Sequence, residues 1–153
     1  MEQKNTLTLG SLFDGSGGFP LGGLLAGVTP VWASEIEPFP IRVTTRRFPN
    51  MKHYGDISRM DGGKIEPVDI ITFGSPCTDM SIAGKRAGLD GAQSSLFYQA
   101  IRIIKEMRCA TNGRYPRWIC WENVVGAFSS NRGLDFKAVL EAVIGIIEPG
   151  AEV

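Results

Sequence analysis

The stretch Val68-Asp69-Ile70-Ile71-Thr72-Phe73-Gly74-Ser75-Pro76-Cys77-Thr78 decides the fold. Its first half is a short apolar run, which is typical of a buried strand in a parallel sheet. Its second half places a cysteine directly behind a proline, just beyond the end of that strand. In open α/β sheets, ligands bind in the crevice outside the carboxyl ends of the strands. We therefore predict that Cys77 is positioned for chemistry; the alternative is a small buried hydrophobe.

Outward from this strand, apolar strands alternate with helical patterns along the chain. We expect strands at 6–13, 31–34, 54–57, 68–73 and 117–121, and helices at 19–26, 38–48, 94–108 and 134–147. Residues 75–93 show little periodicity, which predicts a long loop. The alternation predicts an α/β fold with a parallel sheet that helices cover on both faces.

Composition and charge narrow the class of protein. The 153 residues are 43% hydrophobic and 21% charged, which is ordinary for one globular domain with a core. The net charge of zero argues against a free-standing nucleic-acid binder. No apolar run reaches the roughly 20 residues that span a bilayer, and the first residues lack the apolar stretch of a signal peptide. We therefore expect a cytoplasmic protein with no membrane partner.

Cysteine and histidine usage argues against a disulfide framework and against a metal site. Cys77, Cys109 and Cys120 form no C-x-x-C pair, and His53 is the only histidine. Cys109 falls at the end of an expected helix and Cys120 in an expected strand. For these two cysteines we expect the role of small buried hydrophobes.

A glycine-rich turn, Phe13-Asp14-Gly15-Ser16-Gly17-Gly18, follows the first expected strand and opens a helix. Glycines there let the backbone approach a ligand and aim helix N–H groups at it. Pro20 stands where a dinucleotide fingerprint requires glycine, which argues against a nicotinamide-dependent oxidoreductase. The alternative is a strand–helix turn that holds no ligand.

Acidic residues lie at the carboxyl ends of three of the expected strands. Glu35 lies twenty residues after Gly15, where a carboxylate can accept the hydroxyls of a ribose. Asp56 could accept from an adenine amino group, or simply form a turn after Gly55. Glu122 follows an apolar strand, where we expect a half-buried carboxyl with a raised pKa suited to proton donation and oriented by Asn123. A solvated acid is the alternative at Glu35 and at Glu122.

Taken in order, these pieces resemble the cytosine carbon-5 DNA methyltransferase family. The segments that carry the resemblance are the glycine turn, Glu35, Gly55-Asp56-Ile57, Ser75-Pro76-Cys77 and Glu122-Asn123-Val124. Residues 81–89 are also similar to the mobile catalytic loop of the family. The resemblance implies a Rossmann-like, S-adenosyl-L-methionine-dependent methyltransferase sheet. It also implies methylation of cytosine carbon 5 in double-stranded DNA, as in restriction-modification systems.

The resemblance also implies a role for each matching residue. Cys77 would be the nucleophile, Pro76 would fix its turn, and Glu122 with Asn123 would face the cytosine ring. The residues implied to bind S-adenosyl-L-methionine are Phe13, Asp14, Gly15, Ser16, Gly17, Gly18, Glu35, Ile36, Asp56, Ile57, Ser75 and Leu96. The residues implied to contact DNA are Ser81, Lys85 and Arg86, although a solvated basic pair is the alternative for the last two. No metal is implied.

The chain departs from the family pattern in three ways. Thr78-Asp79 stands where glutamine commonly follows Pro-Cys, and Gln93 stands where many members have arginine. The later family motifs and the target-recognition region have no counterpart. We therefore expect residues 1–153 to be the N-terminal part of the catalytic domain, truncated before its last strands. A C-terminal half would complete it, and its activity alone would be weak or absent.

Two alternative functions stay open at this point. One is a non-catalytic module that binds the cofactor or a protein partner. The other is a tRNA cytosine-5 methyltransferase, because relatives with the same motifs act on tRNA.

Overall fold

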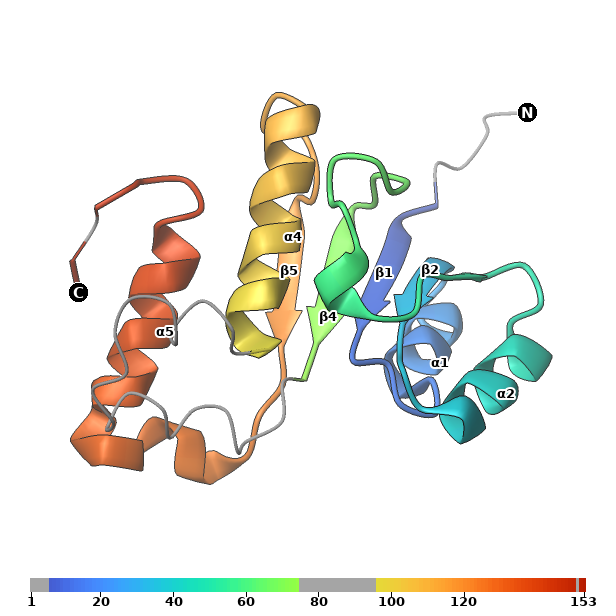
Figure 1. The fold of residues 1–153 in the computed structure, drawn as a ribbon, viewed down its shortest axis with the longest axis horizontal. Helices are drawn as coiled ribbons and strands as arrows, with labels where there is room; N and C mark the ends of the chain where they lie inside the picture. Colours follow the sequence, from blue (N-terminus) through green and yellow to red (C-terminus); the bar gives the residue numbers. More distant parts are fainter. Residues whose placement is uncertain (1–5, 75–95, 151) are drawn as a thin grey trace.

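The computed structural model describes residues 6–74, 96–150 and 152–153 (Figure 1). The strands are β1 (Thr8–Leu12), β2 (Thr29–Ser34), β3 (Lys52–His53), β4 (Ile70–Phe73) and β5 (Trp118–Trp121). The α-helices are α1 (Gly18–Leu25), α2 (Pro38–Arg47), α4 (Leu96–Ala110) and α5 (Leu134–Ile144). Three short 3-10 helices are η1 (Ile57–Arg59), η3 (Val125–Phe128) and η4 (Ser130–Gly133).

The five strands form one parallel sheet in the order β3-β2-β1-β4-β5. From β1 the chain moves outward through β2 to β3, then returns to the other side of β1 as β4. The carboxyl ends of β1 and β4 lie side by side, with Leu12 paired to Phe73. This reversal of strand order creates the crevice where α/β sheets bind ligands. The predicted parallel α/β architecture is confirmed.

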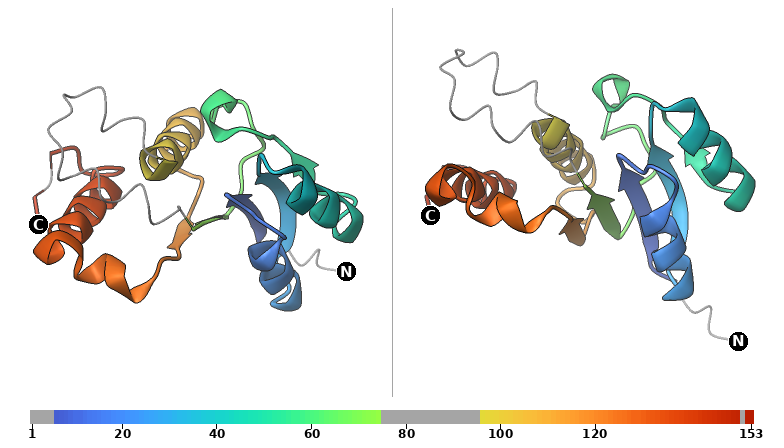
Figure 2. Two further views of the ribbon diagram at one scale, coloured as in Figure 1. Left: turned by 60° about the horizontal axis from the view of Figure 1, so that its bottom comes forward. Right: turned by 90° about the horizontal axis from the view of Figure 1, so that it is seen from below.

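Helices lie on both faces of the sheet, as Figure 2 shows for α1 and α4. Helix α1 packs against β1 and β2. Helix α4 covers the opposite face, where Leu12, Ile71 and Phe73 are fully buried beneath its apolar side. Helix α5 extends this layer past β5, and the ring of Phe136 stacks on Trp121 at 6.4 Å between centroids. The core therefore lies mainly between the sheet and α4.

Trp32 shows how closely the strands are fitted together. Its fully buried indole lies across β1 at Gly10, where an added Cβ would sit 2.2 Å from a ring carbon. The indole Nε1 donates to the carbonyl of Glu66 at 2.8 Å, so burial leaves its polar atom paired. Only glycine fits at position 10 without moving this ring.

Two local predictions are wrong. Residues 54–57 are not a strand end, because β3 is limited to Lys52–His53 and Asp56 instead caps η1 by accepting from the Ser58 N–H at 2.9 Å. Aspartate is favoured at helix N-caps for this hydrogen bond. Cys109 and Cys120 are exposed rather than buried. Cys109 lies in the last turns of α4, and Cys120 points away from α4 on β5, the edge strand of the described sheet.

The described helices include none with the length and apolarity needed to cross a membrane.

Candidate functional site

The glycine turn after β1 is built from backbone in the left-handed region. Phe13 has φ of 54°, Gly15 of 55° and Gly17 of 87°. Glycine adopts this region freely, whereas for Phe13 it carries strain of about 1–3 kcal/mol. At Gly17 an added Cβ would also lie 2.9 Å from the Thr44 side chain of α2. The turn therefore requires glycine at position 17, and it directs Phe13 toward the carboxyl edge of the sheet.

Glu35 ties this turn to the end of β2. Its Oε2 accepts from the Gly15 N–H at 2.7 Å. Its Oε1 accepts from the N–H groups of Ile36 and Glu37 at 2.8 and 3.0 Å. Three backbone donors thus fix the carboxylate, and Oε2 keeps capacity to accept from a ligand.

A cavity of about 310 Å³ opens beside Glu35 at the carboxyl ends of the strands. Six of the residues predicted to bind the cofactor line it: Phe13, Glu35, Ile36, Asp56, Ile57 and Leu96. Three further lining residues were not predicted: Ser34, Glu37 and Gly74. Their positions at strand ends, or next to Glu35, were the available signal. The volume suits a small-molecule site, and apolar walls with few polar groups are typical of such sites.

Asp56 is held in its ionised form in this cavity wall. The hydrogen bond from the Ser58 backbone N–H lowers the pKa of Asp56 below its usual value. An ionised carboxylate can accept a hydrogen bond from an amino group. The cavity therefore combines apolar walls suited to a flat base with the carboxylates of Glu35 and Asp56, which suit hydroxyl and amino donors.

A second cavity, of about 400 Å³, adjoins the first and contains Glu122. It is lined by Phe13, Asp14, Gly18, Phe19, Gly74 and Glu122. Phe13 and Gly74 line both cavities, so the two are neighbours. A Cβ added to Gly74 would lie 2.7 Å from Glu122 Oε2, which places this carboxylate against the end of β4. Phe19 and Gly74 were not predicted as site residues.

Glu122 is exposed, which corrects the expectation of a half-buried carboxyl. Its N–H continues the ladder by donating to Phe73 O at 2.9 Å. The carboxylate is exposed because β5 is the edge strand of the described sheet. The neighbouring Asn123 accepts from the Val124 N–H at 2.8 Å, which shapes the chain as it leaves β5.

Asp14 lies inside the fold rather than in the first cavity, with only 5% of its surface exposed. Burial raises the pKa of Asp14 to about 6, the nearby Ser11 hydroxyl opposes this, and the charge of Glu35 adds to it. Within the described chain, neither Asp14 oxygen accepts a hydrogen bond of good geometry. Asp14 is therefore a buried acid whose pKa of about 6 lies close to neutral pH.

The remaining predicted residues divide into two groups. Within the turn, Ser16 is exposed, Gly17 packs against α2 and Gly18 lines the second cavity. Six predicted residues lie outside the described residues: Ser75, Pro76, Cys77, Ser81, Lys85 and Arg86. A wider hollow of about 800 Å³ lies along α2. No predicted residue lines it, so it is not the candidate site.

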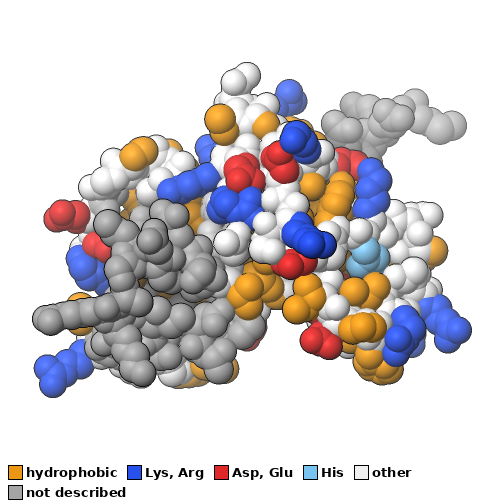
Figure 3. All heavy atoms as spheres, in the orientation of Figure 1, with side chains coloured by type: hydrophobic (Ala, Val, Ile, Leu, Met, Phe, Trp, Pro, Cys, Tyr) orange, Lys and Arg blue, Asp and Glu red, His pale blue; other side chains and the backbone are white. Residues whose placement is uncertain are grey.

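Figure 3 shows hydrophobic side chains gathered low on the visible face, at the level of the carboxyl ends of the strands.

A model of the C-5 cytosine-specific DNA methylase family matches residues 7–146. The chain belongs to this family. The matched residues include those that line both cavities, the glycine turn and Glu122. The candidate site therefore lies within the part of the chain that matches the family.

Two individual relatives are named as methyltransferases. The chain is 36% identical over 133 residues to Type II methyltransferase M1.ScrFI of Lactococcus lactis subsp. cremoris, covering 86% of the chain and 32% of that relative. It is 35% identical over 132 residues to DNA N-6-adenine-methyltransferase of Escherichia phage P1, covering 81% of the chain and 18% of that relative. The chain therefore spans about a third or less of the length of these two relatives.

A solved structure shares the fold. It is described as a DNA modification methyltransferase encoded within a prophage of E. coli, and it aligns with a TM-score of 0.66 at 24% identity. The alignment covers 92% of this chain and 38% of the other. The C-5 cytosine methylase segment therefore adopts a known methyltransferase fold.

Proposed function

We propose that this chain is the cofactor-binding and catalytic part of an S-adenosyl-L-methionine-dependent DNA (cytosine-5-)-methyltransferase. The observation that carries the proposal is the pair of adjoining cavities at the carboxyl edge of the sheet. One contains Glu35 and Asp56, and the other contains Glu122 against Gly74. Membership of the C-5 cytosine-specific DNA methylase family supports the reaction type.

The first cavity fits the adenosine part of the cofactor. Ile36, Ile57 and Leu96 offer apolar walls to the base. Asp56 would accept from the adenine amino group, and Glu35 would accept from the ribose hydroxyls. The glycine turn would pass beneath the methionine end. When bound, S-adenosyl-L-methionine supplies a methyl group on a sulfonium centre.

The chemistry of cytosine explains why a thiol and an acid are needed together. Carbon 5 of cytosine is a weak nucleophile, and addition of the Cys77 thiolate to carbon 6 would turn the ring into an enamine. Attack by carbon 5 on the sulfonium methyl group would break the methyl–sulfur bond and leave S-adenosylhomocysteine. Glu122 would support the proton on ring nitrogen 3 that favours this addition. Loss of the carbon-5 proton to water then expels the thiolate. General acid assistance is worth on the order of 10²–10⁴-fold, and the target base must leave the duplex stack to reach the thiol.

Substrate and setting are further parts of the proposal. The substrate would be double-stranded DNA, contacted by Ser81, Lys85 and Arg86. A C-terminal half, on the same or a complementing chain, would supply target recognition beyond residues 1–153. The named relatives come from bacteria and phages, which supports a bacterial or phage-type cytoplasmic enzyme of the restriction-modification kind.

Covalent trapping tests the proposal. A duplex that contains 5-fluorocytosine cannot lose its carbon-5 substituent as a proton, so a C-5 enzyme remains attached to it. We expect a slow, cofactor-dependent adduct with the chain and none with Cys77→Ala. Cofactor binding without any adduct, by this chain alone and with its C-terminal half present, would instead support the non-catalytic module. An adduct with tRNA alone would support the tRNA enzyme.

The name of one relative favours adenine as a second candidate methyl acceptor. The phage P1 protein is named for methylation of adenine at N-6. Methyl transfer to adenine would not require a thiol adduct, so labelled methyl groups on adenine without trapping would replace the cytosine proposal.

A further inference from the structure

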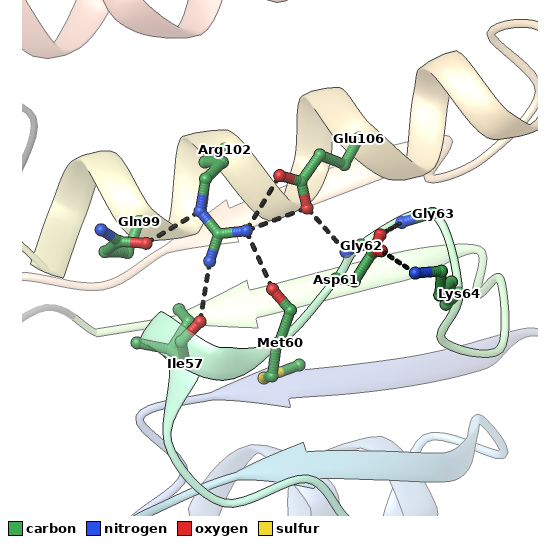
Figure 4. Close-up of polar contacts among 9 residues, drawn as sticks. All are labelled: Ile57, Met60, Asp61, Gly62, Gly63, Lys64, Gln99, Arg102 and Glu106. Atoms are coloured by element: carbon green, nitrogen blue, oxygen red, sulfur yellow. Dashed lines mark hydrogen bonds and ion pairs between the residues drawn. The ribbon is translucent and has the colours of Figure 1, made fainter.

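Helix α4 contacts the candidate cofactor cavity in two ways. Its first residue, Leu96, lines the cavity directly. Further along, Arg102 points from α4 toward the segment 57–63 that follows Asp56 (Figure 4). Its Nη2 donates to the Ile57 carbonyl at 2.8 Å, and its Nη1 donates to the Met60 carbonyl at 2.9 Å. One guanidinium thus holds both ends of η1, whose first residue lines the cavity.

Glu106, one turn further along α4, binds both Arg102 and the loop that follows η1. Its two oxygens accept from Arg102 Nη1 at 2.9 and 3.0 Å. Its Oε2 also accepts from the backbone N–H of Gly62 at 2.7 Å. Gln99 accepts from Arg102 Nε at 2.8 Å. The guanidinium is planar and carries its donors in a fixed fork, so four partners leave it a single orientation.

Gly62 supplies an independent observation of the same fit. A Cβ at this position would lie 2.3 Å from the Ile103 carbonyl oxygen and 2.9 Å from Glu106 Cβ. The loop backbone is therefore seated directly on α4. At the neighbouring Gly63, the nearest atoms to an added Cβ are a side-chain oxygen of Asp61 at 3.3 Å and Ala110 Cβ at 3.5 Å. Only the first glycine is required by the close approach.

We propose that Arg102 and Glu106 are positioning residues that hold the Asp56–Ile57 wall of the cavity in its cofactor-binding geometry. The proposal rests on the function proposed above. The contacts form a short relay: Arg102 fixes the carbonyl of Ile57, and the following Ser58 N–H fixes the carboxylate of Asp56 at 2.9 Å. Without these contacts, the segment that carries Asp56 is free to shift. The loss of affinity should therefore concern the adenosine end of the cofactor.

The test compares two arginines of the same helix. Arg108 donates to the Pro116 carbonyl at 3.0 Å, at the end of α4 away from Leu96. Full chains with Arg102→Met or Arg108→Met are titrated calorimetrically with S-adenosylhomocysteine and with adenosine, and their melting temperatures are measured. We expect similar melting temperatures for the two variants. Arg102→Met should weaken both ligands by the same factor of about ten to a hundred, and Arg108→Met should leave affinity within twofold of wild type.

Two further comparisons keep the test decisive if Arg102→Met does not fold. Arg102→Lys retains the charge but not the fork, and we expect it to weaken binding by an intermediate factor. Gly62→Ala should weaken binding while Gly63→Ala should not.

Each outcome has one meaning. Equal effects of the Arg102 and Arg108 variants, or equal effects of the two glycine variants, would overturn the positioning role. Absence of S-adenosylhomocysteine binding by folded wild-type chain would instead overturn the proposed function, and this inference with it.

Discussion

At the carboxyl end of β2, the Glu35 carboxylate accepts three backbone N–H bonds, whereas at the carboxyl end of β5 the Glu122 carboxylate is exposed and lies against Gly74. The first acid is built into the turn that surrounds it. The second lies on the edge strand of the described sheet. On the proposed function, the difference indicates that the fold itself would form the cofactor side of the site. The cytosine side would depend on groups that arrive with substrate or from other parts of the protein.

The largest expected effect is at Glu35. Glu35→Ala leaves three N–H groups without their acceptor, and hydrogen bonds to charged groups are worth about 1.5–3 kcal/mol each. We expect at least a hundredfold weaker S-adenosylhomocysteine binding and a lower melting temperature. Glu66→Ala is the control, because the Glu66 side chain makes an exposed ion pair with Lys52, which is worth about 0–1 kcal/mol, and the substitution keeps the Glu66 carbonyl that accepts from Trp32. Unchanged binding in Glu35→Ala would erase the contrast between the two strand ends.

The two tryptophans of β5 sharpen the contrast between the faces of the edge strand. Trp121 stacks on Phe136 and meets Phe97 edge to face. Trp118 is 65% exposed. We expect Trp121→Ala to cost about 3 kcal/mol of unfolding free energy and Trp118→Ala to change it by less than about 0.5 kcal/mol. Denaturant titration measures both, and equal costs would show that the exposed face is packed as tightly as the α4 face.

Asp14 makes the stability of the cofactor side depend on pH. Burial raises its pKa to about 6 in the folded chain, above the ordinary value of 3.8. The folded state therefore binds the proton more tightly than the unfolded state does. We expect the contribution of Asp14 to stability to be fully present below about pH 4, to be lost as pH rises through about 6, and to level off at a loss of about 2–3 kcal/mol.

Asp14→Asn removes the charge at neutral pH. We expect this variant to be more stable than wild type at pH 7 and to lose the slope between pH 4 and 6 in thermal melts. An unchanged slope would show that another group causes it.

A smaller effect is expected in the glycine turn. Gly17 combines φ of 87° with a tight contact to Thr44, whereas Gly18 has open space where a Cβ would lie. We expect Gly17→Ala to destabilise the chain by about 1–3 kcal/mol. Gly18→Ala should be nearly neutral. Chemical denaturation of the pair measures the difference, and identical values would mean that the turn tolerates movement.

The smallest effect on folding and cofactor affinity is expected at Glu122. Because its carboxylate is exposed, Glu122→Gln should change melting temperature and S-adenosylhomocysteine affinity within error. The same variant should sharply reduce trapping on 5-fluorocytosine DNA. Loss of cofactor binding in this variant would show that the two strand ends are not independent.

Most strand ends were predictable, because short apolar runs mark the strands and the turn or acidic residues that follow mark where they end. Parallel strands end at one edge, so Glu35 and Glu122 had to lie at the same edge of the sheet. Asp56 lies there as the N-cap of η1 rather than at a strand end, which the sequence did not predict. The inward position of Asp14 was not predictable, because a left-handed Phe13 decides which way the next side chain turns. Exposure of Cys120 depends on its place in an edge strand, which periodicity does not reveal. The Arg102 contact with Ile57 joins residues 45 positions apart, and a helical arginine by itself indicates only a solvated face.

The most direct test of the central claim is calorimetric titration of S-adenosyl-L-methionine into the folded 153-residue chain. The cavity beside Glu35 and Asp56 predicts one site with a dissociation constant in the micromolar range, occupied competitively by adenosine. No binding by chain shown to be folded by circular dichroism would contradict a preformed cofactor side.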